Sequence, residues 1–178
     1  MAIKTFATGE VLTASDTNTY LANSGLVYVT STTIGSAVSS VTVSNCFSST
    51  YDNYRIIVSN STCTNIDLLR FTLASRTGNT YNYANPYYAY SAVWAFHAAQ
   101  NAAFASIALT GTKWSTAIEL QSPNLATTAT WTFANSTETY TYLGGGYSSS
   151  TTASTGFTLT STGTMTGGTI TVYGYRKA

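Results

Sequence analysis

From residue 26 onward, apolar and polar side chains alternate in short runs that Gly, Asn, Ser and Thr separate. In residues 53–59, for example, Tyr54, Ile56 and Val58 share one face of the segment. Alternation with a period of two is typical of a β-strand that buries one of its faces. The pattern predicts strands over residues 26–34, 37–43, 53–59, 66–74, 87–96, 104–109, 114–122, 128–135, 139–147, 155–161 and 169–176.

About ten short strands separated by turn signals favour an antiparallel β-sandwich. We therefore expect an all-β fold in which residues 26–178 form one antiparallel, jelly-roll-like β-sandwich domain. Residues 77–79 and 162–168 predict turns. The glycine run within residues 143–147 predicts a turn or a close approach of two backbones, because glycine carries no side chain.

Two further features bear on the strand pattern. Residues 96–104, FHAAQNAAF, are rich in alanine and predict either a second helix or an Ala-rich loop. The two prolines, Pro86 and Pro123, are expected outside strand centres because proline cannot donate a hydrogen bond to a neighbouring strand.

Residues 1–25 follow a different pattern, which predicts an extended arm and a short helix over residues 14–23. Thr13 is a good N-cap, and Asp16 stands three positions later, as in a capping box. Gly25 suits the left-handed residue that ends a helix. A helix of this length is marginal in water by itself, so we expect the arm to lie on another surface.

The composition then narrows the class of protein. The chain has 178 residues, enough for one domain with one core, and its hydrophobic fraction of 44% excludes a disordered chain. Only 7% of the residues are charged, whereas about 25% is usual. Ser and Thr must therefore supply much of the polar surface. Such a surface also suits a protein that lies against neighbours, where charge would cost desolvation.

The charge pattern argues against several partners. The net charge is +1 and no basic stripe is present, so we expect no binding to nucleic acid. No apolar run approaches the ~20 residues that span a bilayer, and residues 1–20 lack the apolar core of a signal peptide. We expect synthesis in a cytoplasm and no insertion into a membrane. Cys46 and Cys63 are expected to be free thiols, with a bridge as the alternative if their segments are neighbours.

Residues that could carry catalysis are sparse and scattered. His97 is the single histidine, and its surroundings do not resemble a nucleophile motif. Glu119 and Glu138 are the candidate pair of carboxylates for glycoside cleavage, by residue type only. Nothing predicts a metal site or a cofactor. We therefore expect a protein that is not an enzyme.

Aromatic residues are the most informative side chains. Six of them lie within a stretch of fourteen residues, namely Tyr81, Tyr83, Tyr87, Tyr88, Tyr90 and Trp94. Tyr and Trp are rigid and amphipathic, and they are enriched at interfaces. Three interpretations remain open: packing within the domain, an interface between subunits, and a platform on which a glycan stacks.

One segment carries a resemblance to a known class of proteins. Residues 6–29 read F-x-x-G-E-V-L-T-A-S-D-x-N-x-Y-L-x-N-x-G-L-V-Y-V. This segment resembles the N-terminal segment of structural proteins of tailed bacteriophages, of the minor tail, tail fibre or head-fibre kind. The stretches STYDNYRIIVSN, LGGGYSSST and TGFTLTSTGTMTGGTITVYGYRKA are also similar to such proteins.

The resemblance implies a virion protein made in the host bacterial cytoplasm. Its N-terminal segment would attach to other virion proteins, and its β domain would face outward, often in a homotrimer. Six residues are the anchoring candidates, namely Phe6, Glu10, Leu12, Asp16, Tyr20 and Leu21. The β domain would contact the host surface, including a glycan there, or it would decorate and stabilise the capsid. A free carbohydrate-binding module is the alternative outside this class.

Overall fold

The computed structural model describes residues 7–16, 25–65 and 68–177 of the chain. Within these ranges the protein is nearly all β, as the alternating pattern predicted. The strands are β1 (Leu26–Thr33), β2 (Val38–Val43), β3 (Tyr51–Cys63), β4 (Leu68–Leu73), β5 (Tyr81–Ala89), β6 (Trp94–Ala102), β7 (Ala105–Leu109), β8 (Trp114–Gln121), β9 (Ala129–Thr137), β10 (Tyr140–Ser148), β11 (Phe157–Thr166) and β12 (Thr169–Arg176).

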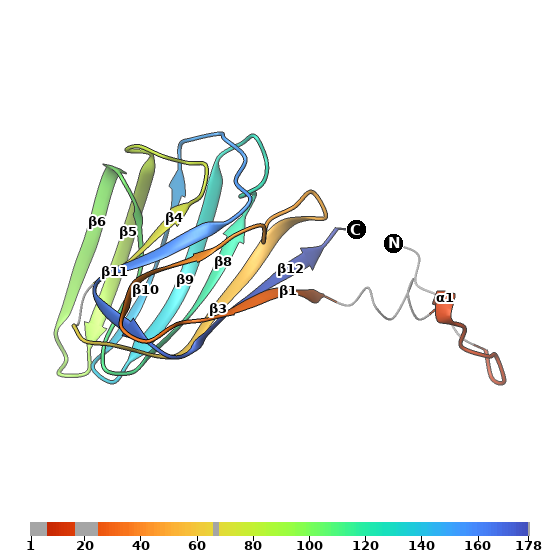
Figure 1. Cartoon of the computed structure of the whole chain (residues 1–178), viewed down its shortest axis with the longest axis horizontal. Helices are drawn as coiled ribbons and strands as arrows, with labels where there is room; N and C mark the ends of the chain where they lie inside the picture. The colour runs from red at the N-terminus through yellow and green to blue at the C-terminus, as the bar shows by residue number, and fades with distance from the viewer. Residues whose placement is uncertain (1–6, 17–24, 66–67, 178) are drawn as a thin grey trace.

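The strands form two antiparallel layers (Figure 1). The large sheet has the order β1-β12-β3-β8-β9-β10-β5-β6, and the small sheet has the order β2-β11-β4-β7. The two layers join where the end of β11 pairs with the end of β3, at Met165↔Cys63 and Thr166↔Thr62. The result is a sandwich that is nearly closed along one side.

The pairings confirm the jelly-roll prediction. Four of them nest along the chain, β1 with β12, β2 with β11, β3 with β8 and β4 with β7. Alternate pairs fall in alternate sheets, as they do when one long antiparallel hairpin wraps into a double-sheet jelly roll. The hairpin β5-β6 follows β4, and the hairpin β9-β10 follows β8. These four strands extend the large sheet beyond the eight-strand jelly roll.

The core lies between the two sheets and is rich in aromatic rings. Phe157 of β11 lies 5.8 Å from Phe47 and 5.4 Å from Phe71, measured between ring centroids. Phe71 in turn lies 6.4 Å from Trp131 of the large sheet. Side chains at every second position of β3, β8, β9 and β11 are buried, so the period-two pattern did identify the inward faces.

The segment expected to be a second helix or a loop is instead strand β6. Its residues pair with β5 from Tyr88↔Trp94 to Tyr81↔Ala102. The single strand expected over 87–96 is therefore the β5-β6 hairpin. Pairing with β5 overrides the helix propensity of the alanines, because strand preference depends on the neighbouring surface.

Two other local expectations need correction. Pro86 lies inside β5, where Asn85 and Pro86 have no bridge partner on β10, so that ladder does not need the missing N–H. The predicted turn over residues 162–168 is confined to Gly167 and Gly168, with φ values of 66° and 86°, because β11 continues to Thr166.

The glycine run lies in β10 and makes a close approach rather than a turn. An added Cβ on Gly144 would clash with the Oδ1 atom of Asn85. Asn85 is buried there and donates from Nδ2 to the Ser106 carbonyl at 3.0 Å and to the Tyr142 hydroxyl at 3.2 Å. Gly144 therefore makes room for a buried amide between β5 and β10.

The described part of the arm contains α1 (Ala14–Asp16) and lies apart from the two sheets in Figure 1. The capping box is present: the Asp16 amide donates to Thr13 Oγ1 at 3.1 Å, and the Thr13 amide donates to Asp16 Oδ2 at 3.2 Å. Gly25 has a φ of 91°, in the left-handed region that favours glycine. Residues 17–23 of the expected helix lie outside the described residues.

Candidate functional site

Large apolar side chains are exposed in two places on the described part of the chain. One group belongs to the arm and β1, namely Val11, Leu12, Leu26 and Tyr28. The other group belongs to β5, β6, β10 and the β5-β6 loop, namely Tyr88, Tyr90, Val93, Trp94, Phe96, Leu143 and Tyr147. Exposed apolar patches of this kind mark binding surfaces more often than isolated exposed residues do. We call the second group the aromatic face.

The strand register builds the aromatic face. Even-numbered residues of β5 and β6 point away from the core, so Tyr88 and Trp94 are neighbours across the hairpin and Pro86 neighbours Phe96. β10 adds Leu143 on the same outer side. The Tyr90 hydroxyl lies 3.2 Å from Thr141 Oγ1, which holds the hairpin tip against β10. A flat apolar surface results at the end of the large sheet.

The six aromatic residues singled out from the sequence divide into two groups. Tyr81 is buried, and its hydroxyl accepts from the Leu73 amide at 2.8 Å and donates to the Arg76 carbonyl at 3.0 Å. Tyr83 and Tyr87 are partly buried against the core. The interpretation as packing within the domain therefore holds for these three residues.

The other three residues point to solvent. The exposed fractions are 52% for Tyr88, 61% for Tyr90 and 68% for Trp94. Sequence reasoning missed Phe96, which is 57% exposed, because the aromatic stretch was taken to end at Trp94 although the predicted strand ran to residue 96. Period-two alternation from Trp94 would have placed Phe96 on the same face as Trp94.

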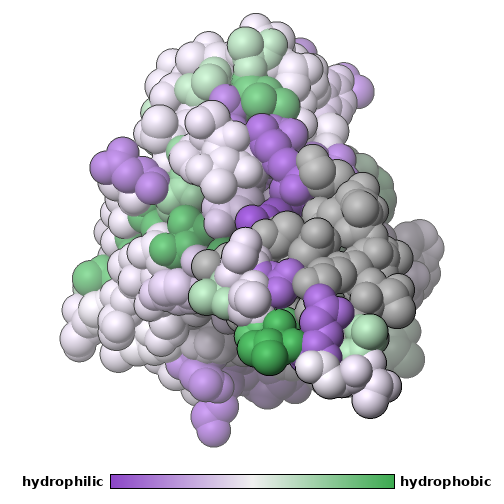
Figure 2. Space-filling model, turned by 90° about the vertical axis from the view of Figure 1, so that its right-hand side faces the viewer, coloured by the Kyte–Doolittle hydropathy of each residue, from purple (hydrophilic) through white to green (hydrophobic). Residues whose placement is uncertain are grey.

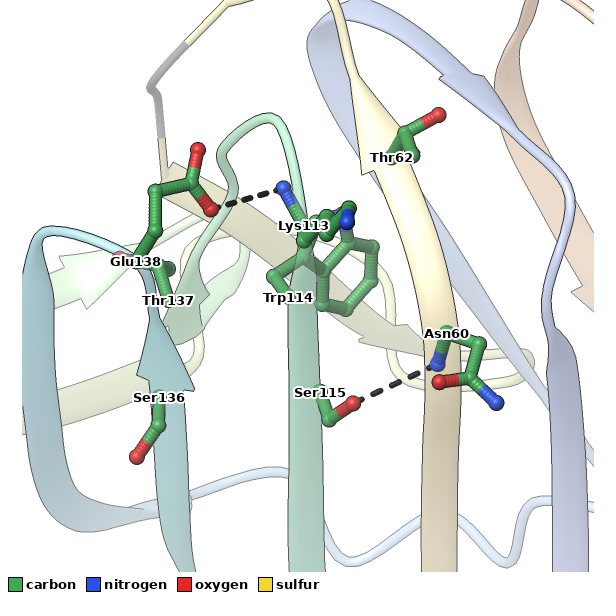
Figure 3. Close-up of a pocket in the computed structure, with 8 residues that line it drawn as sticks. All are labelled: Asn60, Thr62, Lys113, Trp114, Ser115, Ser136, Thr137 and Glu138. Atoms are coloured by element: carbon green, nitrogen blue, oxygen red, sulfur yellow. Dashed lines mark hydrogen bonds between the residues drawn. The ribbon is translucent and has the colours of Figure 1, made fainter.

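A hollow lies beside the start of β8 (Figure 3). It has a volume of about 490 Å³ and is lined by Asn60, Thr62, Lys113, Trp114, Ser115, Ser136, Thr137 and Glu138. The Glu138 carboxylate accepts from the backbone amides of Thr112 and Lys113 at 3.0 and 2.9 Å. A hydrogen bond from the Thr112 side chain, together with these amides, lowers the pKa of Glu138. Glu138 is thus a carboxylate that fastens a turn.

The two candidate carboxylates do not meet. Glu119 lies on the outer face of β8, where it pairs with Arg55 at 3.2 Å and accepts from the Tyr175 hydroxyl at 2.7 Å. The Glu138 carboxylate accepts a hydrogen bond from the Lys113 amide. Lys113 precedes Glu119 by six residues, which corresponds to about 20 Å along a strand. Paired carboxylates in glycoside hydrolases lie roughly 5–9.5 Å apart. The structure therefore does not assemble this pair.

The remaining candidates for catalysis or metal binding are His97, Cys46 and Cys63, and they pack within the sandwich. His97 lies on the inward side of β6, with its ring 5.8 Å from that of Tyr87. Cys46 and Cys63 are free and buried, as expected, and burial raises the pKa of Cys46 to about 12. Among the described residues, His, Cys, Asp and Glu form no cluster of three that could hold a metal ion. In the same part of the chain, no helix has the length and apolar character needed to cross a membrane.

The candidate anchoring residues are partly in view. Phe6, Tyr20 and Leu21 lie outside the described residues. Leu12 is exposed, Glu10 accepts from the Ala7 amide at 3.1 Å, and Asp16 completes the capping box. Val11, which was not among the candidates, is 78% exposed. The described arm therefore presents two adjacent apolar side chains to solvent.

Comparison of the chain with models of protein families, with curated proteins and with solved structures found no match.

Proposed function

We propose that this protein is a non-enzymatic structural protein of a tailed-bacteriophage virion. The N-terminal segment anchors it to other virion proteins, and the jelly roll is displayed outward, where its aromatic face contacts the host surface. The protein acts as a homo-oligomer, with a trimer favoured, so that several weak contacts add up to avidity.

One observation carries the proposal: the two exposed apolar groups lie at opposite edges of the large sheet. The chain enters the sandwich at β1, and the aromatic face lies on β10, β5 and β6 at the far end of the strand order. Seven interstrand spacings separate β1 from β6, or about 33 Å along the sheet. This arrangement allows one edge to be attached while the other is presented.

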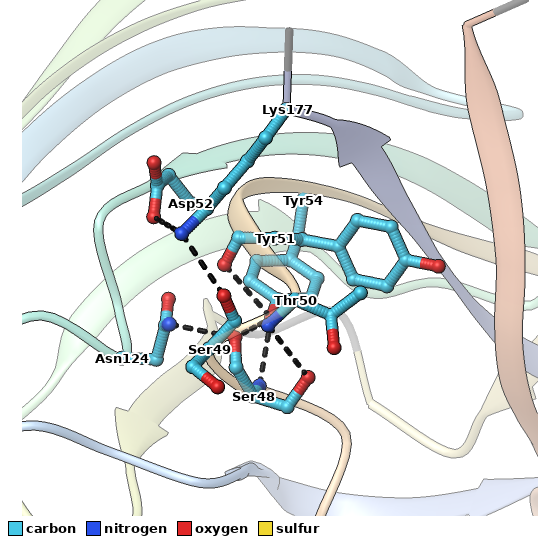
Figure 4. Close-up of polar contacts among 8 residues, drawn as sticks. All are labelled: Ser48, Ser49, Thr50, Tyr51, Asp52, Tyr54, Asn124 and Lys177. Carbon is cyan, nitrogen blue, oxygen red and sulfur yellow. Dashed lines mark hydrogen bonds and ion pairs between the residues drawn. The ribbon is translucent and has the colours of Figure 1, made fainter. Parts of the chain in front are cut away.

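At the edge of the large sheet where the arm joins β1, Lys177 just after β12 makes contacts that fix the end of β12 (Figure 4). Lys177 pairs with Asp52 at 2.7 Å and donates to the Ser49 carbonyl at 2.9 Å. The Arg176 amide lies 3.4 Å from the Gly25 carbonyl. The Lys177 contacts hold the end of β12 against β3, and the Arg176 contact holds it against the residue before β1, so a load on the arm would pass directly into the large sheet.

The surface chemistry supports the same proposal. Seen from the side of the arm, the surface is mostly near neutral in hydropathy, with strongly hydrophilic and hydrophobic groups scattered over it (Figure 2). A surface of hydroxyl groups and few charges packs against neighbouring proteins with a small desolvation cost. The resemblance of residues 6–29 to phage structural proteins points in the same direction.

The test compares two variants on purified particles of the phage that encodes the chain. In the double variant Val11→Asp, Leu12→Asp the arm is polar, whereas the control Val93→Asp changes an exposed valine of the aromatic face. We expect the arm variant to be lost from particles while its sandwich still folds, and we expect the Val93 variant to remain attached. Retention of the arm variant would contradict anchoring through the arm.

Electron cryomicroscopy of the wild-type particles decides the position. Density at the tail that disappears on deletion of residues 6–25 supports the attachment role. Density on the head would instead indicate a capsid decoration or head-fibre protein that stabilises the shell. A monomer that binds sugars and never associates with particles would indicate a free carbohydrate-binding module.

A further inference from the structure

Within the aromatic face, next to Tyr147, the outer surface of the large sheet is hollowed. The hollow has a volume of about 260 Å³ and is lined by Asn82, Tyr83, Ala84, Ala99, Gln100, Gly145, Gly146 and Tyr147. We propose that this hollow binds a neutral oligosaccharide. The inference rests on the proposed attachment function only for the source of the glycan, which would be the host surface.

The shape of the hollow follows from the register of three strands. Gly145 of β10 pairs with Ala84 of β5, and Ala84 pairs with Ala98 of β6. All three positions face outward, so one row across the sheet carries no large side chain. Gly145 and Ala84 line the hollow, and Ala98 continues the row on the edge strand beyond the lining. This row forms the floor of a trough that runs across the strands for two interstrand spacings, about 10 Å.

Larger side chains stand on both sides of the floor. On one side of the floor, two positions further along each strand, stand Leu143, Pro86 and Phe96. On the other side, two positions away in the opposite direction, stand Tyr147 and Asn82, which pair with each other. Gln100 stands beside them on β6. The backbones of the two walls are about 14 Å apart. A trough one row wide suits a single chain of sugar rings, and its length suits two linked pyranose rings.

The walls have the chemistry that sugars require. Tyr147 in the lining, and Phe96 on the edge strand beyond it, present exposed aromatic rings against which the C–H face of a pyranose can pack. Side-chain amides can both donate to and accept from sugar hydroxyl groups, and Gln100 is an exposed amide at the end of the floor. The trough therefore combines apolar contact with a few polar groups, as ligand sites usually do.

A bulge in β6 shapes the amide wall. The register passes from Tyr83↔Ala99 to Tyr81↔Ala102, so β6 carries an extra residue opposite Asn82. Asn101, in this bulge, has a φ of 50°, and its amide donates to Asn82 Oδ1 at 3.1 Å. Asn82 Nδ2 donates to the Thr80 carbonyl at 3.3 Å. The bulge thus holds Asn82 rigidly, and bulges commonly re-aim side chains beside binding sites.

The charge of the lining selects the class of glycan. None of the eight lining residues carries a formal charge at neutral pH. A sialylated or phosphorylated sugar would lose hydration here and find no cation to pair with. The same bulge interrupts the β6 ladder, so β6 is a poor template for pairing with a second copy of the chain. An uncharged oligosaccharide is therefore the occupant that the trough fits.

The test places a large side chain over the floor of the trough by substituting an exposed residue. Ala98 is exposed on the edge strand, so Ala98→Trp places an indole over the floor without changing the core. The matched control is Ala117→Trp, on the outer face of β8 and two strands away from β10. The probe is a panel of immobilised neutral oligosaccharides of glucose, galactose, mannose and N-acetylglucosamine, with sialylated and phosphorylated sugars on the same support. Purified full-length protein is used.

We expect the wild-type protein to retain at least one neutral oligosaccharide. Ala98→Trp should weaken that binding by about tenfold or more, Gln100→Ala should weaken it less, and Ala117→Trp should leave it unchanged. Retention of acidic sugars alone, retention of no sugar, or wild-type binding by Ala98→Trp would each overturn the inference. A change in oligomeric mass on Ala98→Trp, without a change in sugar binding, would assign the trough to a subunit interface and overturn it too.

Particle association separates this inference from the proposed function. A protein that attaches to particles but binds no neutral oligosaccharide would overturn the trough assignment alone. A protein that binds the oligosaccharide but never attaches to particles would overturn the virion proposal and leave the trough assignment standing.

Discussion

At the scale of single residues, Arg76 is the most unusual side chain of the described structure. It is fully buried, and burial lowers its pKa. Within the described residues no carboxylate is among its hydrogen-bond partners, and the guanidinium donates instead to backbone carbonyls of Ser122, Pro123, Leu125, Thr127 and Ser150. Arg76 therefore holds two loops at the end of the sandwich by satisfying carbonyls that would otherwise be buried without partners.

We predict that Arg76→Met lowers the free energy of unfolding by ~3–5 kcal/mol, because several buried carbonyls lose their donor. Arg76→Lys should recover little of this loss, since an ammonium group cannot reach the same set of acceptors. The control is Arg55→Met, whose side chain is 38% exposed in its ion pair with Glu119. It should change stability by less than about 1 kcal/mol. Urea unfolding followed by fluorescence measures both, and equal losses would contradict this account.

At the scale of elements, β6 shows how a neighbour decides local structure. Its sequence, WAFHAAQNA, contains four alanines and no β-branched residue, so local preference alone does not favour a strand. The outer edge of β5 supplies hydrogen-bond partners and half-buried rings for β6 to cover. Alternate side chains of β6 then face the interior or the solvent, which creates the exposed pair Trp94 and Phe96.

We predict that a synthetic peptide of residues 94–104 has no strand signal in circular dichroism in water, because its strand partner is missing. The matched control is a peptide of residues 81–102, which contains both strands of the hairpin. This longer peptide should show more extended structure, although an isolated hairpin is only marginally stable. A strong strand signal in the short monomeric peptide would show that local propensity, rather than pairing, determines β6.

At the scale of the whole molecule, burial of titratable groups couples stability to alkaline pH. Desolvation raises the pKa of Cys46 to about 12, and it raises the pKa values of Tyr54, Tyr81 and Tyr142. In the unfolded chain these groups ionise near 9.0 for cysteine and 10.0 for tyrosine. The native state thus prefers their neutral forms.

We predict that the free energy of unfolding is constant with respect to these groups below about pH 9 and falls as the pH rises from there toward 12. The sign follows from the raised native pKa values, because the unfolded chain releases these protons first. Urea midpoints at a series of pH values measure the fall, and the part of the tyrosinate absorbance that comes from Tyr54, Tyr81 and Tyr142 should appear only together with unfolding. Cys46→Ser is the comparison that removes one contributor. A midpoint unchanged between pH 8 and pH 11 would contradict the prediction.

The sequence by itself determined the strands and their inward faces over most of the domain. Burial in a sandwich alternates from one residue to the next, so β3, β8, β9 and β11 could be recognised from local pattern. The capping box of Thr13 and Asp16 was equally readable, because both partners stand within one turn. The jelly-roll class followed from the number and spacing of the strands.

Only the tertiary structure decided which aromatic residues are available for binding. Tyr81 and Tyr88 are similar in sequence context, yet the first packs under the small sheet and the second faces solvent. The distance between Glu119 and Glu138, and the trough over Gly145, Ala84 and Ala98, depend on the register between strands far apart in the chain. Periodicity fixes which face of a strand is buried, but it does not determine which residues of two distant strands stand opposite each other, because that depends on the pairing.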